Sequence, residues 1–147
     1  MVYEWKQGTR HSVAPEVAAQ VMDGLAKQGN LTAAALVDAS RPEDAPLHGE
    51  FEWTDSIAAE KWREQQGRTM IAALVIRRED VPEQEPVRAY FKLEAAPVYE
   101  QTVKILAEDM TKKLLLEQAK RELKAFQRKY AALEELADVF TAIDKVG

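Results

Sequence analysis

An apolar loop in the middle of the chain constrains the fold more than any other feature. Residues 46–53 carry a proline and a glycine, which favour a loop, yet they also carry Leu47, Phe51 and Trp53. Burying a large apolar side chain stabilises a fold by about 1.5–3 kcal/mol. We therefore expect this loop to be inserted into a hydrophobic core, where it separates the elements before it from those that pack after it.

A short strand and two helices are predicted before this loop. Residues 3–5 alternate in the manner of a strand, and the first helix is expected to begin near Pro15, because proline suits the first helical turn. Apolar residues at every fourth position give that helix one buried face, and Gly29 is expected to end it. Thr32 is then the expected cap of a short second helix over residues 33–39.

A third helix is predicted directly after the loop. Thr54 or Asp55 is expected to cap it, and Trp53 is expected to pack on Ala58 as a hydrophobic staple. Because Ala58 and Trp62 are four residues apart, we expect both to face the core. The more polar side of this helix carries Lys61, Glu64 and Arg68.

A β-hairpin is predicted next. Gly67 weakens the third helix and is expected to end it. The second half of the apolar run 70–76 predicts a buried strand, and residues 87–93 alternate between apolar and polar, which is typical of a half-buried strand. Residues 77–86 between them are mostly charged and contain two prolines. We therefore expect an antiparallel hairpin with a long charged tip.

The last third of the chain is predicted to be helical. From Leu116 onward, apolar residues recur at alternating steps of three and four, which predicts one long helix over residues 110–144. This apolar stripe can pack on the N-terminal core or against a second copy of the chain, and we expect the second arrangement. The predicted oligomerisation residues are Leu116, Leu123, Phe126, Tyr130, Leu133 and Phe140.

Composition and charge exclude several classes of protein. The chain has 147 residues, enough for one domain with an appended element, and it lacks the roughly 18 consecutive apolar residues of a membrane span. It has no cysteine, which excludes disulfides and thiolate chemistry and fits a cytoplasmic protein. The net charge of −5 gives no general attraction to nucleic acid, so binding of that kind needs a local basic face.

No catalytic or metal-binding group of residues is evident. His48 stands alone, so we expect it to fix the loop by hydrogen bonding rather than to act as an acid–base group. Glu50, Glu52 and Asp55 have no further ligand at suitable spacing, and Asp55 is better explained as a helix cap. The aromatic side chains around them are expected in the core rather than in a ligand site. We therefore expect no enzymatic activity, no cofactor and no metal.

Several residues also match a family pattern. In the central stretch they are Pro46-Leu47-His48, Phe51-Glu52-Trp53, Asp55, Ala58-Ala59 and Arg63. Towards the two ends they are Tyr3, Trp5-Lys6, Gly8, Arg10, Leu133, Glu135-Leu136 and Phe140. On these residues the chain resembles a family of uncharacterised small proteins of tailed phages and prophages, which implies a bacterial host cell and carries no assigned activity. Gly67 departs from the pattern, which has a helix-favouring residue such as alanine at that position.

The predicted order of elements is that of a winged helix-turn-helix. In that fold the third helix reads the DNA major groove and the hairpin loop contacts the backbone. We therefore predict an α+β, mainly helical chain, with a winged-helix-like core over residues 1–95 and a long C-terminal helix in an oligomerisation element over residues 97–147. The candidate DNA-binding residues are Lys61, Arg63, Arg68, Arg77, Arg78 and Arg88.

Acidic side chains near these cations weaken the case for DNA. Glu60 and Glu64 share the third helix, and further acids occupy the hairpin tip. Three functions therefore stay open. The one we favour is a non-enzymatic, phage-encoded, DNA-associated regulator that acts as an oligomer. The others are a protein–protein adaptor or inhibitor of a host factor, for which an acidic chain is no handicap, and a structural accessory of the virion.

Overall fold

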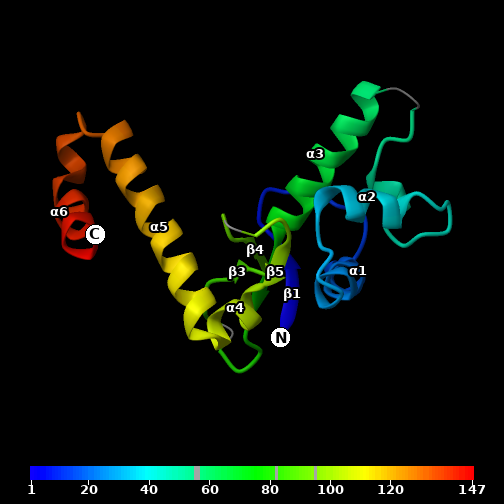
Figure 1. The fold of residues 1–147 in the computed structure, drawn as a ribbon, viewed down its shortest axis with the longest axis horizontal. Helices are drawn as coiled ribbons and strands as arrows, with labels where there is room; N and C mark the ends of the chain where they lie inside the picture. The colour runs from blue at the N-terminus through cyan, green and yellow to red at the C-terminus, as the bar shows by residue number, and fades with distance from the viewer. Residues whose placement is uncertain (55–56, 82, 95) are drawn as a thin grey trace. The chain divides into compact units, whose positions relative to one another are not determined.

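The computed structural model describes an α+β chain that divides into two compact units, Met1–Lys104 and Ile105–Gly147 (Figure 1). The described residues are 1–54, 57–81, 83–94 and 96–147, and for Ile57 and Ala58 only the backbone is described. Among these residues, no helix combines the length and the apolar character needed to cross a membrane. The predicted cap at Asp55 and the predicted side-chain contacts of Ala58 lie outside the described residues.

The N-terminal unit combines helices with two small antiparallel sheets. Its elements are β1 (Val2–Trp5), α1 (Pro15–Lys27), α2 (Ala33–Ser40), the 3-10 helix η1 (His48–Glu50), α3 (Ile57–Ala73), β2 (Leu74–Arg77), β3 (Val87–Arg88), β4 (Tyr90–Lys92) and β5 (Tyr99–Gln101). The division between the units falls within α4 (Thr102–Ala107). The C-terminal unit continues with α5 (Asp109–Lys129), the 3-10 helix η2 (Glu134–Leu136) and α6 (Ala137–Val146).

Local sequence signals account for the bounds of α1 and α2. Pro15 occupies the first turn of α1, as predicted. Gly29 ends that helix in a left-handed conformation with φ of 68°, and Asn30 donates its backbone N–H to the carbonyl of Leu25 at 2.9 Å. This closure satisfies a carbonyl that the helix end leaves free. The hydroxyl of Thr32 accepts a backbone N–H from the first turn of α2 at 3.0 Å, which confirms the predicted cap.

α3 continues through Gly67, so the prediction that this glycine ends the helix is wrong. A Cβ atom built on Gly67 would lie 3.3 Å from the carbonyl oxygen of Ala33, the first residue of α2. The glycine therefore lets the two helices approach closely, and their packing offsets its low helix propensity, about 1 kcal/mol relative to alanine. α3 ends at Ala73 and β2 follows at once, which confirms the buried strand predicted in the second half of residues 70–76.

The single strand expected over residues 87–93 is divided into β3 and β4, which belong to two separate sheets. β1, β2 and β3 pair in that order, and β4 pairs with β5. β1 confirms the predicted N-terminal strand, and β2 and β3 confirm the antiparallel hairpin. The expected alternation is wrong at Val87, which is 48% exposed, and at Tyr90, which is fully buried. It holds at Ala89 and Leu93, which are buried as expected. The change of sheet occurs at Ala89, whose N–H still bonds β2 while its carbonyl already accepts a bond from α4.

The central loop is inserted into the core, as predicted. Leu47 and Phe51 are 1% and 7% exposed, and both belong to the core cluster shared by α1, α2 and α3. Trp53 is half-buried beside them, and its indole N–H donates to the carbonyl oxygen of His48 at 2.7 Å. The His48 ring stacks on Trp53, and its Nδ1 lies 2.9 Å from the carbonyl oxygen of Ser40. This geometry confirms the hydrogen-bonding role predicted for His48.

The order of elements in the N-terminal unit follows the prediction. One strand, three helices and a β-hairpin succeed one another as β1, α1, α2, α3 and β2–β3. α2 and α3 pack against each other, but the connection between them contains η1 and is longer than the 3–4-residue turn of a simple helix-turn-helix. The α+β class is therefore confirmed at the level of helices combined with small antiparallel sheets.

The C-terminal unit is a helical hairpin, so the single long helix predicted over residues 110–144 is wrong. α5 ends at Lys129, α6 begins at Ala137, and the two helices run side by side in opposite directions (Figure 1). Lys124 of α5 pairs with Asp144 of α6 at 3.3 Å across this hairpin. The apolar spacing continues through the turn without a proline or glycine to mark it, so periodicity alone does not reveal the reversal.

Candidate nucleic-acid interface

One side of α3 is exposed along the length of the helix, and we call it the α3 ridge. Its spacing of three and four residues places its members along one side of the helix. The α3 ridge consists of Lys61, Trp62, Gln65, Arg68 and Thr69. Trp62 is 56% exposed, so the prediction that it faces the core is wrong. The buried side passes through Gly67 and Met70 instead, because the close contact with α2 fixes the rotation of α3.

Arg63 is 3% exposed, so its predicted role as a DNA contact is wrong. Its guanidinium donates to the backbone carbonyls of Glu52 and Thr54, at 2.7 and 3.2 Å, and to the carboxylate of Glu60 at 2.7 Å. It also lies over the ring of Trp53, 5.1 Å from the centroid. A planar group with several fixed donors is well suited to join a loop to a helix. Arg63 therefore anchors the central loop on α3.

Of the two acidic residues of α3, Glu60 is paired with arginines and Glu64 lies beside the α3 ridge. Glu60 accepts hydrogen bonds from Arg63 and from Arg41. The bond from Arg63 is the main reason that the pKa of Glu60 lies below its usual value, so the carboxylate stays charged and paired. Glu64 is half-buried at the edge of the ridge, where it shares a hollow with Arg68. The exposed ridge itself contains two cations and no carboxylate.

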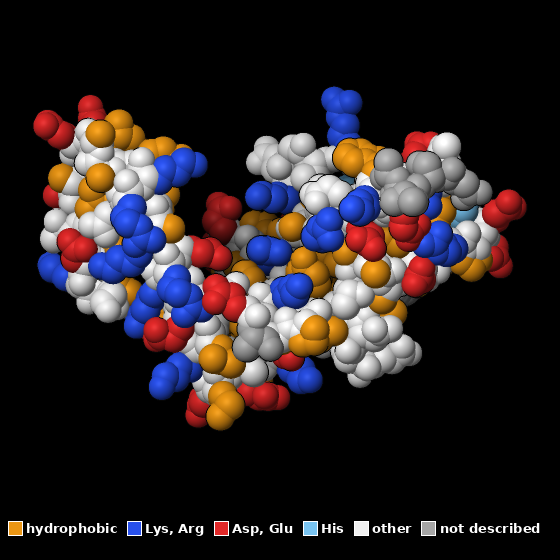
Figure 2. Space-filling view, turned by 45° about the horizontal axis from the view of Figure 1, so that its top comes forward, with side chains coloured by type: hydrophobic (Ala, Val, Ile, Leu, Met, Phe, Trp, Pro, Cys, Tyr) orange, Lys and Arg blue, Asp and Glu red, His pale blue; other side chains and the backbone are white. Residues whose placement is uncertain are grey.

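Hollows beside the α3 ridge bring further cations close to it. One hollow, of about 440 Å³, is lined by Lys6 together with Arg68 and Thr69 of the ridge. A second, of about 210 Å³, is lined by Arg68 and Lys92, and a third contains Arg10. The space-filling view shows Lys and Arg side chains over the N-terminal unit, with Asp and Glu side chains among them (Figure 2). Lys6, Arg10 and Lys92 are not among the predicted residues, because nothing in their local sequence relates them to α3.

The remaining predicted DNA-binding residues lie on the hairpin. Arg77 pairs with Glu4 at 2.5 Å, and Arg78 pairs with Asp80 at 2.6 Å. Arg88 lies on β3, where it lines a separate cavity on the three-stranded sheet. The described residues of the hairpin tip are mostly exposed and acidic. Of the six predicted contacts, the structure therefore places two on the α3 ridge and four elsewhere.

Glu50 holds the N-terminal segment on the central loop. Its Oε1 accepts the backbone N–H groups of Ser12 and Val13, both at 2.9 Å, and its Oε2 lies 3.4 Å from Nδ1 of His11. Burial raises the pKa of Glu50, but these hydrogen bonds and that of the Ser12 hydroxyl outweigh burial and hold the pKa below its usual value. Among the described residues, no group of three or more His, Asp or Glu side chains is arranged to hold a metal ion.

A second polar cluster joins α1 to both sheets. Asp23 of α1 accepts hydrogen bonds from the hydroxyls of Tyr3 and Tyr90, at 2.8 and 2.7 Å, and from the amide of Gln101 at 2.9 Å. Burial, followed by the hydrogen bond to Asp23, raises the pKa of Tyr3 to about 12, and the same causes raise the pKa of Tyr90. Because both hydroxyl protons are committed to Asp23, the cluster ties elements together rather than offering a reactive group.

The predicted oligomerisation residues are divided between the two helices of the C-terminal unit. They are Leu116, Leu123, Phe126 and Tyr130 on α5 and its C-cap, Leu133 in the connection, and Phe140 on α6. The first five are more than a third exposed, and Phe140 is half-buried. Exposed apolar side chains at helical spacing leave a face of this helical hairpin open to solvent.

No family model matches the chain, and neither a curated protein nor a solved structure resembles it closely enough to show a relative.

Proposed function

We propose that this chain is a non-enzymatic, DNA-associated regulatory protein, encoded by a phage or prophage, whose α3 ridge enters the DNA major groove. One observation carries the proposal. The α3 ridge presents two cations, two polar groups that donate and accept hydrogen bonds, and an indole, while the partly exposed carboxylates of Glu60 and Glu64 lie beside it. In a chain with a net charge of −5, this face is a local exception of the kind that nucleic-acid binding requires.

The side chains of the α3 ridge suit the edges of bases. An arginine donates two hydrogen bonds to guanine, a glutamine pairs with adenine, and the methyl group of threonine contacts thymine. Gln65, Arg68 and Thr69 provide these three groups within two turns of helix. The major groove, about 12 Å wide, admits an α-helix.

Cations beside the α3 ridge are suited to phosphates. Lys6 and Arg10 follow β1 on one side of the ridge, and Lys92 lies on β4 on the other. Contacts of this kind fix the register of a protein on DNA and carry most of the salt dependence. The acidic hairpin tip does not suit phosphate, so in this proposal the residues after β1 and on β4 replace the wing of a winged helix.

Fluorescence anisotropy with a labelled DNA duplex of mixed sequence tests this proposal at low salt. Reversing the charge of both ridge cations, Lys61→Glu with Arg68→Glu, should abolish binding. Arg78→Glu is the matched control, because Arg78 is an exposed arginine on the hairpin tip and lies outside the interface. For the wild type, the logarithm of affinity should fall with the logarithm of salt by about 0.9 for each phosphate neutralised.

Two results contradict the proposal. One is the absence of binding by the wild type at low salt. The other is an equal loss of binding in the Arg78→Glu control and in the ridge variant, which would mean that net charge rather than the α3 ridge decides the affinity. Circular dichroism of each variant shows whether the fold is retained, and exposed charges contribute little to stability.

We further propose that the protein acts as an oligomer through the open face of α5 and α6. A large apolar side chain left in water forgoes about 1.5–3 kcal/mol of burial, and five of the predicted contact residues are exposed. Light scattering at micromolar concentration tests this part separately. A dimer or larger species that Leu123→Lys converts to a monomer supports it, whereas a monomeric wild type removes it.

A protein–protein adaptor is the second candidate, and the same C-terminal unit favours it. Met110 at the start of α5 is 77% exposed and Leu106 of α4 is 52% exposed, so apolar surface extends beyond the predicted oligomerisation residues. Co-purification from bacterial cells with and without nuclease separates the two candidates. A partner protein that is retained after nuclease treatment and lost in Leu123→Lys favours the adaptor.

A further inference from the structure

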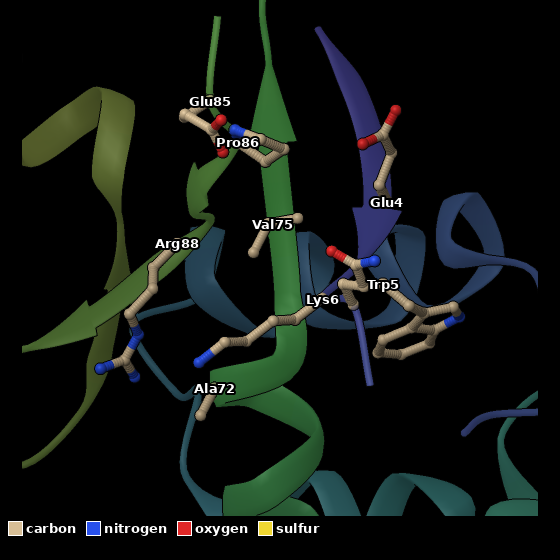
Figure 3. Close-up of a pocket in the computed structure, with 9 residues that line it drawn as sticks. Glu4, Trp5, Lys6, Ala72, Val75, Glu85, Pro86 and Arg88 are labelled. Atoms are coloured by element: carbon tan, nitrogen blue, oxygen red, sulfur yellow. The ribbon is translucent and has the colours of Figure 1, made fainter. Parts of the chain in front are cut away.

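A cavity of about 600 Å³ lies on the outer face of the three-stranded sheet. Strand register places Glu4, Val75 and Arg88 in one row across β1, β2 and β3, so their side chains share this face. In the neighbouring rows, Leu74 and Ile76 of β2 point the other way, into the core. Lys6, just after β1, and Ala72, near the end of α3, close one end of the cavity (Figure 3).

Two cations extend into this cavity. The side chains of Lys6 and Arg88 both run towards its Ala72 end (Figure 3). The Nε of Arg88 is buried and meets no hydrogen-bond acceptor among the described residues. The guanidinium lies over the ring of Phe91, 4.9 Å from the centroid, which fixes its position without satisfying its donors. Nε therefore binds no described carboxylate, and the positive charge of the guanidinium is not neutralised through it.

The carboxylates of the cavity wall do not neutralise these cations. Glu4 is held by Arg77 at 2.5 Å, and its carboxylate is directed away from Lys6 (Figure 3). Glu85 lies with Pro86 at the opposite end of the cavity from the amino group of Lys6 (Figure 3). The cavity is therefore polarised, with a cationic end, an acidic end and an apolar floor between them.

We propose that this cavity binds a small organic oxyanion whose carboxylate or phosphate group lies between Lys6 and Arg88 and whose apolar body rests on Val75. A guanidinium forms paired, charge-assisted hydrogen bonds with both kinds of oxyanion. The lysine adds a second positive charge beside the first. The cavity volume falls in the range of small-molecule sites, about 300–1,000 Å³.

Titration with sodium benzoate, and in a second arm with inorganic phosphate, tests the site through the amide shifts of the whole protein in NMR spectra. Sodium chloride keeps the ionic strength constant. We expect at least one probe to give saturable shifts that centre on residues lining the cavity, and the two arms show whether a carboxylate or a phosphate is preferred. Benzoate has a planar apolar body, so a stronger response to benzoate indicates that the apolar floor takes part.

Three variants locate the binding. Arg88→Met should weaken it at least about tenfold, which is the loss expected when a charge-assisted pair of hydrogen bonds is removed. Lys6→Met should weaken it in the same direction, and it keeps the experiment informative if Arg88→Met does not fold. Arg78→Met is the matched control, since Arg78 lies on the hairpin tip outside the cavity, and it should bind as the wild type does.

Two outcomes overturn this inference. One is the absence of saturable shifts with either probe beyond those caused by chloride. The other is unchanged affinity in both Arg88→Met and Lys6→Met. Because the titration contains no DNA, its result is independent of the proposed function, and a failure of DNA binding leaves the oxyanion site standing.

Discussion

Replacing Arg63 with alanine tests whether this arginine holds the fold, in contrast to Arg68, which is proposed to contact DNA. Arg63 and Arg68 lie on the same helix, but the first is 3% exposed and the second is exposed on the α3 ridge. Arg68→Ala is therefore the matched control. It should change the free energy of unfolding by no more than about 0.5 kcal/mol, as is usual for a surface substitution.

The contacts of Arg63 set the size of the expected loss. Its bonds to the carbonyls of Glu52 and Thr54 are charge-assisted, and each contributes about 1.5 kcal/mol, the low end of the usual range, because both residues are exposed and water can replace the donor. Its position over the ring of Trp53 adds about 0.5–1 kcal/mol. The pair with Glu60 is left out of the sum, because that carboxylate is open to solvent. Arg63→Ala should therefore cost about 3–4 kcal/mol.

Thermal unfolding followed by circular dichroism measures this difference. For a unit of this size, each kcal/mol lowers Tm by about 4 °C or more, so Arg63→Ala should lower it by at least about 12 °C. Arg63→Lys keeps the charge but loses the planar fork, so it should fall between the wild type and the alanine variant. Equal Tm values for Arg63→Ala and Arg68→Ala would refute the structural role assigned to Arg63.

Three further changes test other parts of the N-terminal unit. Phe51→Ala should cost about 3–5 kcal/mol in urea denaturation, because it empties a core aromatic site, and a loss below about 1 kcal/mol would mean that the central loop lies outside the core. Gly67→Val should destabilise by about 1–3 kcal/mol, because its side chain meets the carbonyl of Ala33, and a valine variant as stable as the wild type would contradict the close helix contact. The pKa of Tyr3 is raised from 10.0 to about 12, so its contribution to stability is complete below pH 10 and is lost as pH rises through 12. The Tyr3→Phe variant should therefore lose less free energy of unfolding than the wild type as pH rises from 10 to about 12. If the two proteins show the same dependence of stability on pH, Tyr3 does not titrate in that interval.

The features that sequence predicted well depend on local chemistry. Proline at the start of α1, a hydroxyl at the start of α2 and a glycine after α1 each act within one helical turn. The inserted central loop was predictable for a similar reason, because Leu47 and Phe51 are too apolar to remain in water wherever the loop lies. None of these inferences requires knowledge of a distant residue.

The orientation of α3 depends on its neighbours and could not be read from its own residues. The helix mixes alanine, charged and amide residues around its circumference, so its amphipathic signal is weak. Successive residues differ by about 100° around a helix, so a rotation of about 100° decides whether Trp62 or Arg63 faces the core. The contact at Gly67 selects the rotation that exposes the tryptophan and buries the arginine, which is the reverse of the prediction.

Lys6 connects the two sites of the N-terminal unit. It lines both the cavity on the sheet and the hollow beside the α3 ridge, and its neighbours there come from segments about seventy residues away, brought together by the pairing of β1 with β2. An oxyanion in the cavity and a DNA phosphate beside the ridge would compete for the same ammonium group. If both sites act as proposed, occupancy of the cavity and affinity for DNA are negatively linked, and linkage requires each ligand to weaken the other by the same factor.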